Sequence, residues 1–391
     1  MTDRPGTFDG VHRRNLSKLL GLVHLEGPQS RARLTAATGL NRSTVGALAG
    51  ELIGLGLVEE RAPDPTNRVG RPSPVVAARA DVLAIAVNPE VDAVTIAAVG
   101  LNGRIAVRER IEMDRLVTPD ETARLVAATL TRWRRGAIAS ANVVAVGLAV
   151  PGLVRASDGL VRFAPHLEWA DAPLRALVEQ AIGLPVAVDN DASLGAAAEH
   201  LFGAGRGVDD LVYLNGGASG IGGGLIVHGR PVGGVGGYAG EFGQNRPGID
   251  AAGDRRAPGG VLEDEVSRAR LLEIAGMSSA DEPTLAAALA AAGDRPEVAA
   301  ELARQRRILG TALANAVNVL NPALIILGGF LATLAEHDLD ALRDALAAQA
   351  MPAAAEAVEL RVAALGEDRL LIGAAEAAFA GLLADPLASA S

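Results

Sequence analysis

The sequence predicts an α/β protein in which a small helical head precedes a larger body made of two successive lobes. A helix-turn-helix pattern followed by a strand, a loop and a strand occupies residues 1–80, whereas strand meanders and helices alternate twice in residues 81–391. The net charge also changes sign, from +4 in the first part to −14 in the second. Repeated meanders with helices are typical of a duplicated α/β fold with a cleft between its lobes. We therefore predict a winged helix-turn-helix domain at 1–80 and a two-lobed body at 81–391.

The head is predicted to pack three helices. One helix is expected at about 10–26, and the segment "QSRARLTAATGLNRSTVGALAGEL" supplies two more. Ser30 is a suitable N-cap for the first of these, Gly39 can end it in the left-handed conformation, and Asn41 can cap the second. Helix, short glycine-containing turn and helix together form the helix-turn-helix motif. The predicted core residues are Leu16, Leu19, Leu20, Val23, Leu34, Val45, Leu48, Leu52 and Ile53.

The second helix of the motif begins with side chains suited to nucleic acid. Short donors and one arginine can contact base edges and phosphates when this turn enters a major groove. The following strand, loop and strand predict a wing, whose "GRP" segment at 70–72 can enter a minor groove, where arginine is favoured. The positive charge of the head favours a polyanionic partner, although a small helical oligomerisation module is the alternative. The candidate DNA contacts are Arg31, Asn41, Arg42, Ser43, Thr44, Arg68 and Arg71.

Composition excludes several other classes of protein. The chain has no cysteine, so disulfides and thiolate metal sites are excluded. No apolar run reaches the ~18–20 residues that a membrane helix needs. The stretch "MTDRPGTFDGVHRR" lacks the apolar core of a signal peptide. We therefore expect a cytoplasmic location and no membrane partner.

The body contains two sets of strands separated by helices. The first set begins with three strands over about 82–112 and the second with two strands over about 211–227. We place the lobes at about 81–190 and 191–391, and the last helix is a candidate to return to the first lobe.

Polar side chains stand where a buried strand of the body is predicted to become a helix, in "VDNDASLGAAAEH". Asp189, Asn190 and Asp191 follow this strand directly. Open α/β sheets bind ligands at the carboxyl ends of their strands, so these side chains are candidates for a ligand site. The alternative is that Asp189 caps the helix and Asp191 is solvated.

Three segments of the body, "VDNDASLGAAAEH", "GIGGGLIVHGRPVGGVGGYAGEFG" and "NPALIILGG", occur in an order and spacing that resemble the ROK family of repressors, open reading frames and sugar kinases. The head resembles the winged helix-turn-helix of ROK transcriptional repressors, such as those for xylose and N-acetylglucosamine. The resemblance covers nearly the whole chain. It implies an actin-like, hexokinase-like body, which is a duplicated ribonuclease H-like fold.

The resemblance also implies which residues bind the effector. In ROK kinases the Asp of an Asn-Asp pair is the general base for the sugar hydroxyl, and Asn190 and Asp191 match that pair. The Glu of the family's "AGE" segment, here Glu241, hydrogen-bonds the sugar. A carboxylate that can accept a hydroxyl proton can also simply bind the hydroxyl. The candidate effector-binding residues are Asn190, Asp191, Glu241, Gln244, Glu263 and His166.

One departure from the family pattern argues against kinase activity. ROK kinases open their body with Asp-x-Gly-Gly-Thr, a turn that approaches the nucleotide phosphates. Here the equivalent stretch is Asn88-Pro89-Glu90-Val91-Asp92. Proline removes an amide donor, and two carboxylates disfavour a nearby triphosphate. We therefore expect no catalytic residue, and Asp191 occupies a vestigial base position. The glycine-rich turn at 216–224 is kept, but such turns also serve as plain strand connections.

A second departure concerns zinc. Family members follow "AGE" with Gly-His and a cysteine-rich loop that bind structural zinc. This chain has Gln244 at the position of the His and no cysteine. Zinc sites need thiolate, imidazole or carboxylate ligands, so no zinc and no other cofactor is expected. The loop at 245–260, rich in Pro, Gly, Asp and Arg, is then expected to be mobile.

The sequence therefore predicts a transcriptional regulator, most simply a repressor, that binds operator DNA and responds to a sugar or sugar derivative. A homodimer or a dimer of dimers is expected, because helix-turn-helix proteins contact paired half-sites. Three alternatives stay open: a ROK sugar kinase that kept its head, a DNA-binding protein that no longer responds to sugar, and an interaction scaffold.

Overall fold

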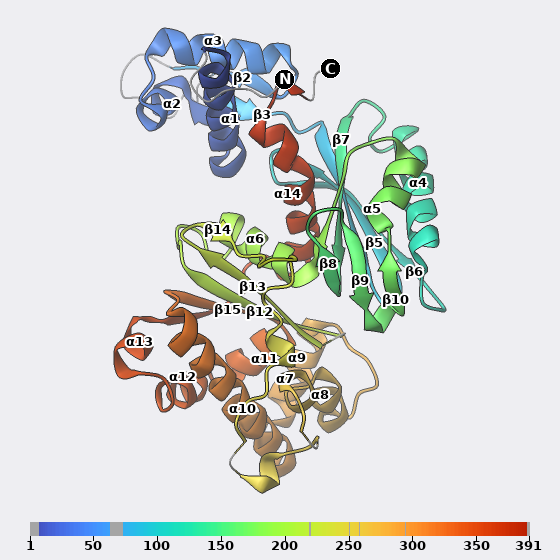
Figure 1. The fold of residues 1–391 in the computed structure, drawn as a ribbon, viewed down its shortest axis with the longest axis vertical. Helices are drawn as coiled ribbons and strands as arrows, with labels where there is room; N and C mark the ends of the chain where they lie inside the picture. The colour runs from blue at the N-terminus through green and yellow to red at the C-terminus, as the bar shows by residue number, and fades with distance from the viewer. Residues whose placement is uncertain are drawn as a thin grey trace. The chain divides into compact units, whose positions relative to one another are not determined.

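The computed structural model describes residues 8–62, 73–218, 220–249, 251–257, 259–293 and 295–388. The chain divides into two compact units (Figure 1). Unit 1 consists of Met1–Ala149, Pro173–Val188 and Ala374–Ser391, and unit 2 of Val150–Ala172 and Asp189–Gly373. Among the helices of the described residues, none combines the length and apolar character that a membrane span requires.

The head of unit 1 has the predicted helix-turn-helix. Its helices are α1 (Phe8–Glu26), α2 (Arg31–Thr38) and α3 (Arg42–Gly54). The side chain of Ser30 accepts from the Arg33 amide at the start of α2, and Gly39 ends that helix with φ of 72°. Asn41 caps α3 by accepting from the Thr44 amide. All three predicted caps are therefore confirmed.

The core of the head is also as predicted except at one position. Leu16, Leu19, Leu20, Val23, Leu34, Val45, Leu48 and Leu52 are buried. Ile53 is 38% exposed, so its prediction as a core residue is wrong, and Ala49 is buried instead. Residues 45, 48, 49 and 52 follow the helical spacing of a single face, and position 53 lies at the edge of that face.

A three-stranded sheet completes the head. It consists of β1 (Gln29–Ser30), β3 (Val75–Ala78) and β2 (Val58–Arg61), in that order. β2 and β3 are the antiparallel strands of the predicted wing, whereas β1, which pairs with β3 through Gln29 and Val76, was not predicted. The tip of the wing, with Arg68 and Arg71, lies outside the described residues.

The body part of unit 1 is built on a five-stranded sheet in the order β11-β7-β4-β5-β6. β4, β5 and β6 form an antiparallel meander, and β7 pairs with β4 in parallel. Gly147 of β7 lets α14 approach closely, since a Cβ atom there would overlap the Ala374 backbone. Figure 1 shows α4 and α5 on one side of this sheet and α14 on the other. The bounds are β4 (Val82–Pro89), β5 (Ala93–Gly100), β6 (Ile105–Glu112), α4 (Pro119–Arg134), β7 (Asn142–Val150), α5 (Leu174–Ile182), β11 (Val186–Asn190) and α14 (Arg369–Ala384).

Unit 2 repeats this topology with the order β14-β13-β12-β15-β16. In both sheets the first strand of a meander pairs with a following parallel strand, which confirms the duplicated α/β fold. On β12, Val212 and Leu214 face the large core of the unit, while Leu211 and Tyr213 pack with Ala196 of α6 on the other face. The strands are β12 (Leu211–Gly217), β13 (Gly220–Val227), β14 (Arg230–Pro231), β15 (Leu324–Gly329) and β16 (Glu359–Val362).

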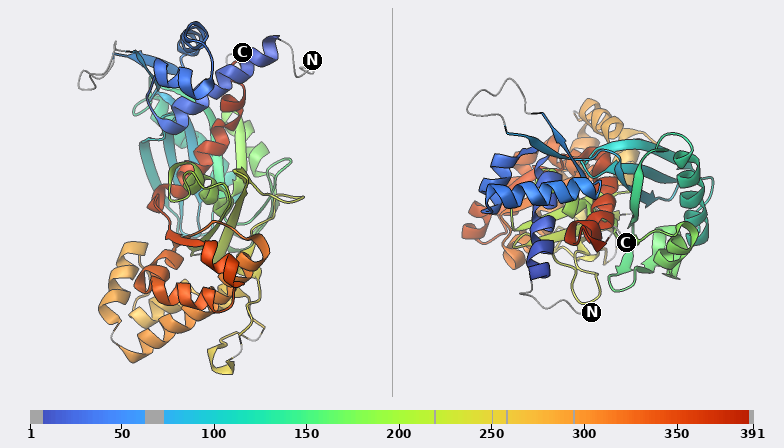
Figure 2. Two further views of the ribbon diagram at one scale, coloured as in Figure 1. Left: turned by 90° about the vertical axis from the view of Figure 1, so that its left-hand side faces the viewer. Right: turned by 90° about the horizontal axis from the view of Figure 1, so that it is seen from above.

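Helices cover both faces of the unit 2 sheet. The helices α10 to α13 gather on one side of it (Figures 1 and 2). A small sheet of β8 (Leu153–Arg155), β9 (Leu160–Ala164) and β10 (Trp169–Ala172) was not predicted. The helices are α6 (Asp191–Phe202), α7 (Leu262–Glu265), α8 (Arg268–Ala275), α9 (Glu282–Ala292), α10 (Pro296–Leu320), α11 (Phe330–His337), α12 (Leu339–Ala347) and α13 (Pro352–Ala357).

Candidate effector site and DNA-binding surface

The first turn of α3 presents exposed polar groups. Asn41, Arg42 and Ser43 are exposed, and Thr44 is half-buried. The Asn41 Oδ1 atom accepts from the Thr44 amide at 2.8 Å and from the Ser43 hydroxyl at 2.6 Å. This cap orders the turn and leaves the Asn41 amide nitrogen as a donor. Within the described parts of the chain, the Arg42 guanidinium has no hydrogen bond or ion pair, so it is available to a phosphate or a base edge.

Arg31 is held differently. Its guanidinium pairs with Glu60 of β2, with Nε at 2.7 Å and Nη2 at 3.0 Å from the two carboxylate oxygens. This pair ties α2 to the wing, so Arg31 would have to leave Glu60 to reach DNA. Its role as a DNA contact stays a prediction.

Glu263 of α7 is the centre of a polar cluster in unit 2. One carboxylate oxygen accepts from the Gln244 side-chain amide at 2.6 Å, and the other accepts from the Ile221 backbone amide at 3.1 Å. Glycines make room for the carboxylate, because a Cβ atom at Gly243 would lie 2.6 Å from Glu263 Oε2 and one at Gly220 would overlap it. Gly220 also has φ of 122°, which only glycine adopts readily. The glycine-dense turns therefore position a carboxylate.

Glu241 lies close enough to Glu263 for the two carboxylates to repel each other. Burial, and then the negative charge of Glu263, raise the pKa of Glu241 above its ordinary value. The residue as a whole is exposed at the surface. Burial and a like charge both disfavour the ionised form of a carboxylate. Gln244 and Glu263 are thus joined by a side-chain hydrogen bond, and the Gln244 backbone amide donates to the Glu241 carbonyl at 3.2 Å, while the role of all three in effector binding stays a prediction.

Asn190 and Asp191 stand at the start of α6. Asn190 is its N-cap: Oδ1 accepts from the Ser193 amide at 3.0 Å, and Nδ2 donates to the Gly152 carbonyl at 3.0 Å. The helix cap is thus Asn190 rather than Asp189. Burial raises the pKa of Asp189. Asp191 is half-buried and accepts from the Ala192 amide through Oδ1.

Packing connects this helix start to the cluster around Glu263. A Cβ atom at Gly222 of β13 would lie 2.7 Å from the Ala192 Cβ and 4.0 Å from Asp191 Oδ1. Gly222 directly follows Ile221, whose amide donates to Glu263. The Asn190 amide is occupied by structural bonds, so its part in ligand binding stays a prediction, as does that of Asp191.

His166 lies in the short 3₁₀ helix Pro165–Leu167 and is exposed. Among the described residues it has no hydrogen bond or ion pair with Glu241, Gln244 or Glu263. Its part in the effector site stays a prediction.

The first hairpin of unit 1 replaces the phosphate-binding turn of the kinases. Asn88 is buried at the end of β4 and faces Thr95 of β5. Pro89 has no amide hydrogen, and the Glu90 amide donates to the Ala93 carbonyl at 2.8 Å. Neither position therefore offers a backbone donor to a phosphate. The carboxylates of Glu90, Asp92 and Glu112 surround Arg110, with N···O distances of 2.7, 3.1 and 2.9 Å.

The equivalent hairpin of unit 2 keeps its glycines. Asn215 faces Gly222, and Gly217 faces Gly220 across β12 and β13. Gly216 packs on Phe330, where a Cβ atom would lie 2.5 Å from the ring. These glycines satisfy close packing and the Glu263 contact, so they are explained without a nucleotide.

Sequence analysis missed the residues that support this site. The amide of Ile221 and the space at Gly243 complete the Glu263 environment, and buried Arg304 and Glu265 lie behind it. The available signal is that Arg304 falls on the same helical face as the apolar Ile308, four residues later. A cation among buried positions needs paired acceptors.

Comparisons with known proteins agree with this architecture. The ROK family model matches residues 84–380. A xylose repressor of Caldicellulosiruptor bescii is 28% identical over 378 residues, which cover 91% of this chain and 93% of that protein. A glucokinase of Halalkalibacterium halodurans is 32% identical over 255 residues, 59% of this chain and 75% of that enzyme.

A solved structure is similar over the full length. The crystal structure of a ROK family transcriptional regulator, a homologue of the E. coli MLC protein, superposes with a TM-score of 0.76 at 24% identity and covers 97% of this chain and 99% of that one. This likeness supports the fold of head and body alike. Since the family model spans most of the chain, the protein belongs to the ROK family.

Proposed function

We propose that this chain is a ROK transcriptional repressor that releases its operator when a sugar or sugar derivative binds in unit 2. The observation that carries the proposal is the exposed first turn of α3, where Arg42 has no partner among the described residues, in a chain that a xylose repressor matches almost end to end. A sugar kinase needs no such turn. The glucokinase, by contrast, matches only 59% of the chain.

The effector site is proposed to use Glu241, Gln244 and Glu263, together with Asp191 at the start of α6. Carboxylates accept hydrogen bonds from hydroxyl groups, and a side-chain amide can both donate and accept them, so this set suits a polyol. Asn190 and His166 complete the proposed site. The effector would shift the protein between two states only if it binds them with different affinity.

A sugar kinase is the second candidate, because the glucokinase is 32% identical and Asn190-Asp191 matches the catalytic pair of such enzymes. The hairpin of unit 1 argues against it. Its Pro89 and Glu90 provide no free backbone donors, and the carboxylates of Glu90, Asp92 and Glu112 all pair with Arg110. Repulsion between this acidic cluster and a triphosphate disfavours nucleotide binding. We therefore propose that the chain has no kinase activity.

We also propose that the protein holds no zinc and no other cofactor. The donor set after Glu241 does not fit zinc, because Gln244 is a neutral amide already bonded to Glu263 and the chain contains no cysteine.

The proposed DNA-binding form is a homodimer or a dimer of dimers, since helix-turn-helix proteins read two half-sites about one helical turn apart. The wing arginines Arg68 and Arg71, together with Arg31 and the α3 turn, are the proposed contacts.

DNA binding can be tested with DNA from upstream of the chain's own gene in fluorescence anisotropy. Arg42→Ala is expected to weaken specific binding by about 1–3 kcal/mol if the arginine reads a base. Arg175→Ala changes a half-buried arginine of the body that pairs with Glu179; it is the matched control and should bind normally. Unchanged affinity of Arg42→Ala would remove Arg42 from the interface.

Kinase activity can be tested by following ATP consumption with a panel of hexoses, pentoses and aminosugars. The expected rate is that of the protein-free background. Turnover that disappears in Asp191→Asn would overturn the assignment as a regulator without enzymatic activity.

A further inference from the structure

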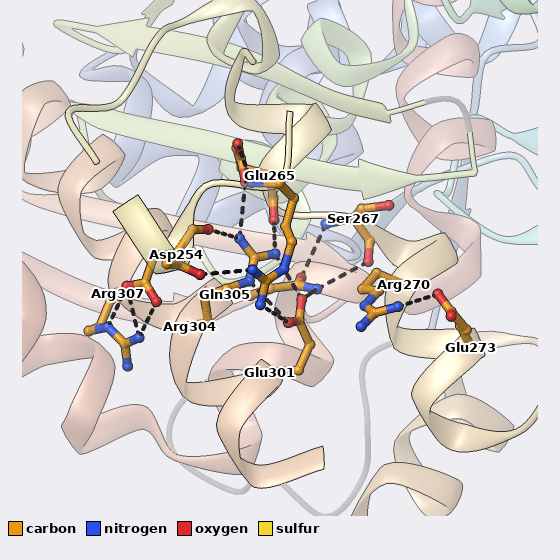
Figure 3. Close-up of polar contacts among 11 residues, drawn as sticks. Asp254, Glu265, Ser267, Arg270, Glu273, Glu301, Arg304, Gln305 and Arg307 are labelled. Atoms are coloured by element: carbon orange, nitrogen blue, oxygen red, sulfur yellow. Dashed lines mark hydrogen bonds and ion pairs between the residues drawn. The ribbon is translucent and has the colours of Figure 1, made fainter. Parts of the chain in front are cut away.

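The segment 254–257, which lies in the loop predicted to be mobile, bonds to a buried charge network in unit 2. Figure 3 shows the network, which links α7, α10 and the segment around Asp254. Glu265, Glu301 and Arg304 have side chains that are 0%, 4% and 3% exposed. Residues 254, 256 and 257 of the loop bond to this network through their backbone, whereas mobility of the loop at 245–260 stays a prediction.

Arg304 uses its full donor capacity. A guanidinium has five N–H groups, and here it makes five hydrogen bonds. Nε and Nη2 donate to the Glu301 carboxylate at 3.0 and 2.8 Å, and Nη1 donates to Glu265 Oε2 at 3.0 Å. The remaining two bonds reach backbone carbonyls, those of Asp254 at 2.8 Å and Glu265 at 2.6 Å. A lysine could not reproduce this arrangement, because it has three donors at one point.

Glu265, which is bound by Arg304, also binds the backbone of the loop. Its carboxylate accepts from the backbone amides of Arg256 and Ala257, each at 3.0 Å. The segment is therefore held by Glu265 at the amides of residues 256 and 257, and by Arg304 at the Asp254 carbonyl. The Arg256 guanidinium lies 3.8 Å from Glu301, so two arginines offset two carboxylates.

The same short helix carries the effector candidate. α7 spans Leu262–Glu265, so Glu263 and Glu265 are two residues apart on one turn. Glu265 is fixed by Arg304 and the loop amides, whereas Glu263 meets Gln244 and the Ile221 amide. Gln305 extends the support, since Oε1 accepts from the Ser267 amide at 3.1 Å just after α7.

We infer that Arg304 is a positioning residue of the effector site: it fixes α7 and the 254–257 segment through Glu265 and so sets the place of Glu263. The role rests on the proposed function, in which Glu263 binds the effector. Groups that orient the direct contacts of a site typically change its affinity about 10–100-fold when they are lost, as measured at metal sites. In this proposal the charge network orders the turn that carries Glu263, and no metal ion bound at Gln244 is needed to do so.

The test uses the full chain and two variants. Arg304→Met removes the cation, and the triple variant Arg304→Met, Glu265→Gln, Glu301→Gln also removes the buried negative charges, so that folding does not depend on an uncompensated charge. Arg343→Met is the control, because this exposed arginine of α12 pairs with Asp340 away from the network. Amide hydrogen exchange is measured at Ile221, Arg256 and Ala257. D-Xylose, D-glucose and N-acetyl-D-glucosamine are the probes of operator release.

In the folded variants, exchange at all three amides is expected to rise about tenfold or more, while operator affinity without sugar stays normal. The sugar concentration for half-release should rise by a similar factor. Native exchange at Ile221 in the triple variant would overturn the positioning role. Faster exchange of the unmodified protein in EDTA would also overturn it, since a metal would then hold the loop. If no sugar releases the unmodified protein from its operator, the proposed effector class fails, while the exchange data still decide the role of Arg304.

Discussion

Two buried basic side chains hold distant parts of the sequence together, and they differ in how they respond to protons. In unit 1, His24 of α1 lies between the Leu101 carbonyl and Glu376 of α14. In unit 2, Arg304 of α10 lies between Glu265 and Glu301. Histidine titrates near neutral pH, whereas arginine stays charged. The head of unit 1 therefore contacts α14 through a pair that titrates near neutral pH, whereas α7 is held by a pair that does not titrate in that range.

Both ring nitrogens of His24 face acceptors. Nδ1 lies 2.6 Å from the Leu101 carbonyl oxygen, and Nε2 lies 2.9 Å from Glu376 Oε2. The Phe379 ring meets the imidazole edge-on, with centroids 6.0 Å apart. A neutral imidazole has one N–H, so satisfying both acceptors requires a proton shared within the His24–Glu376 pair.

The pKa of His24 follows from these contacts. Burial lowers it, but the hydrogen bond and charge of Glu376 and the Leu101 carbonyl outweigh burial, so the pKa of His24 lies above its ordinary value of 6.5. A raised pKa in the folded state stabilises the protein fully at pH below the unfolded value. That contribution is lost as the pH rises through the folded pKa.

The Arg304 network contributes to stability over the opposite range of pH. Burial raises the pKa of Glu301, but hydrogen bonds from Arg304 and Gln305 outweigh it and place the pKa below the ordinary 4.5. Its contribution is therefore present above about that pH and is lost in acid. Between pH 6 and 9 this network should not change.

The largest expected effect comes from removing the ring of His24. His24→Ala leaves the Glu376 carboxylate, 9% exposed, without its partner, and breaking a buried pair costs about 3–5 kcal/mol. Urea unfolding followed by circular dichroism at pH 6 measures the free energy of unfolding. The double variant with Glu376→Met should recover part of the loss. A cost below about 1 kcal/mol for His24→Ala would mean that the pair does not hold the head.

A smaller effect is expected from pH alone, because raising the pH removes only the proton. The free energy of unfolding of unit 1 should fall between pH 6 and 9 in the unmodified protein. It should be flat in the variant with His24→Gln and Glu376→Gln, which removes both titrating groups. Operator affinity measured over the same pH range shows whether loss of the His24–Glu376 contact also weakens DNA binding by the head. An equal slope in both proteins would assign the pH dependence to other groups.

The sequence predicts those parts of the two units whose physics is local. Ser30, Gly39 and Asn41 act within three or four residues of themselves, and their roles as caps are confirmed. Helical periodicity places the core of the head correctly up to the edge of α3, where Ile53 turns outward. The two-residue strand β1 has no period to detect and exists because β3 pairs with it.

Contacts between distant residues explain what could not be predicted. His24 and Glu376 are 352 positions apart, and Arg304 and Glu265 are 39 apart, so no spacing rule connects them. Asn190 shows a different limit. Its residue type and position matched a ligand contact. In the structure its side-chain oxygen instead caps α6, and its side-chain nitrogen donates to the Gly152 carbonyl. Only the fold brings Gly152 within reach and reveals the structural use.

The smallest effect is expected from a cation that water can reach. Arg110 in the first hairpin of unit 1 pairs with Glu90, Asp92 and Glu112, but its side chain is 41% exposed. Exposed pairs contribute about 0.2–1 kcal/mol and are screened by salt. Arg110→Ala should therefore cost no more than about 1 kcal/mol in urea unfolding, and less at high salt. A loss comparable to that of His24→Ala would show that burial does not decide how strongly a basic side chain holds its partners.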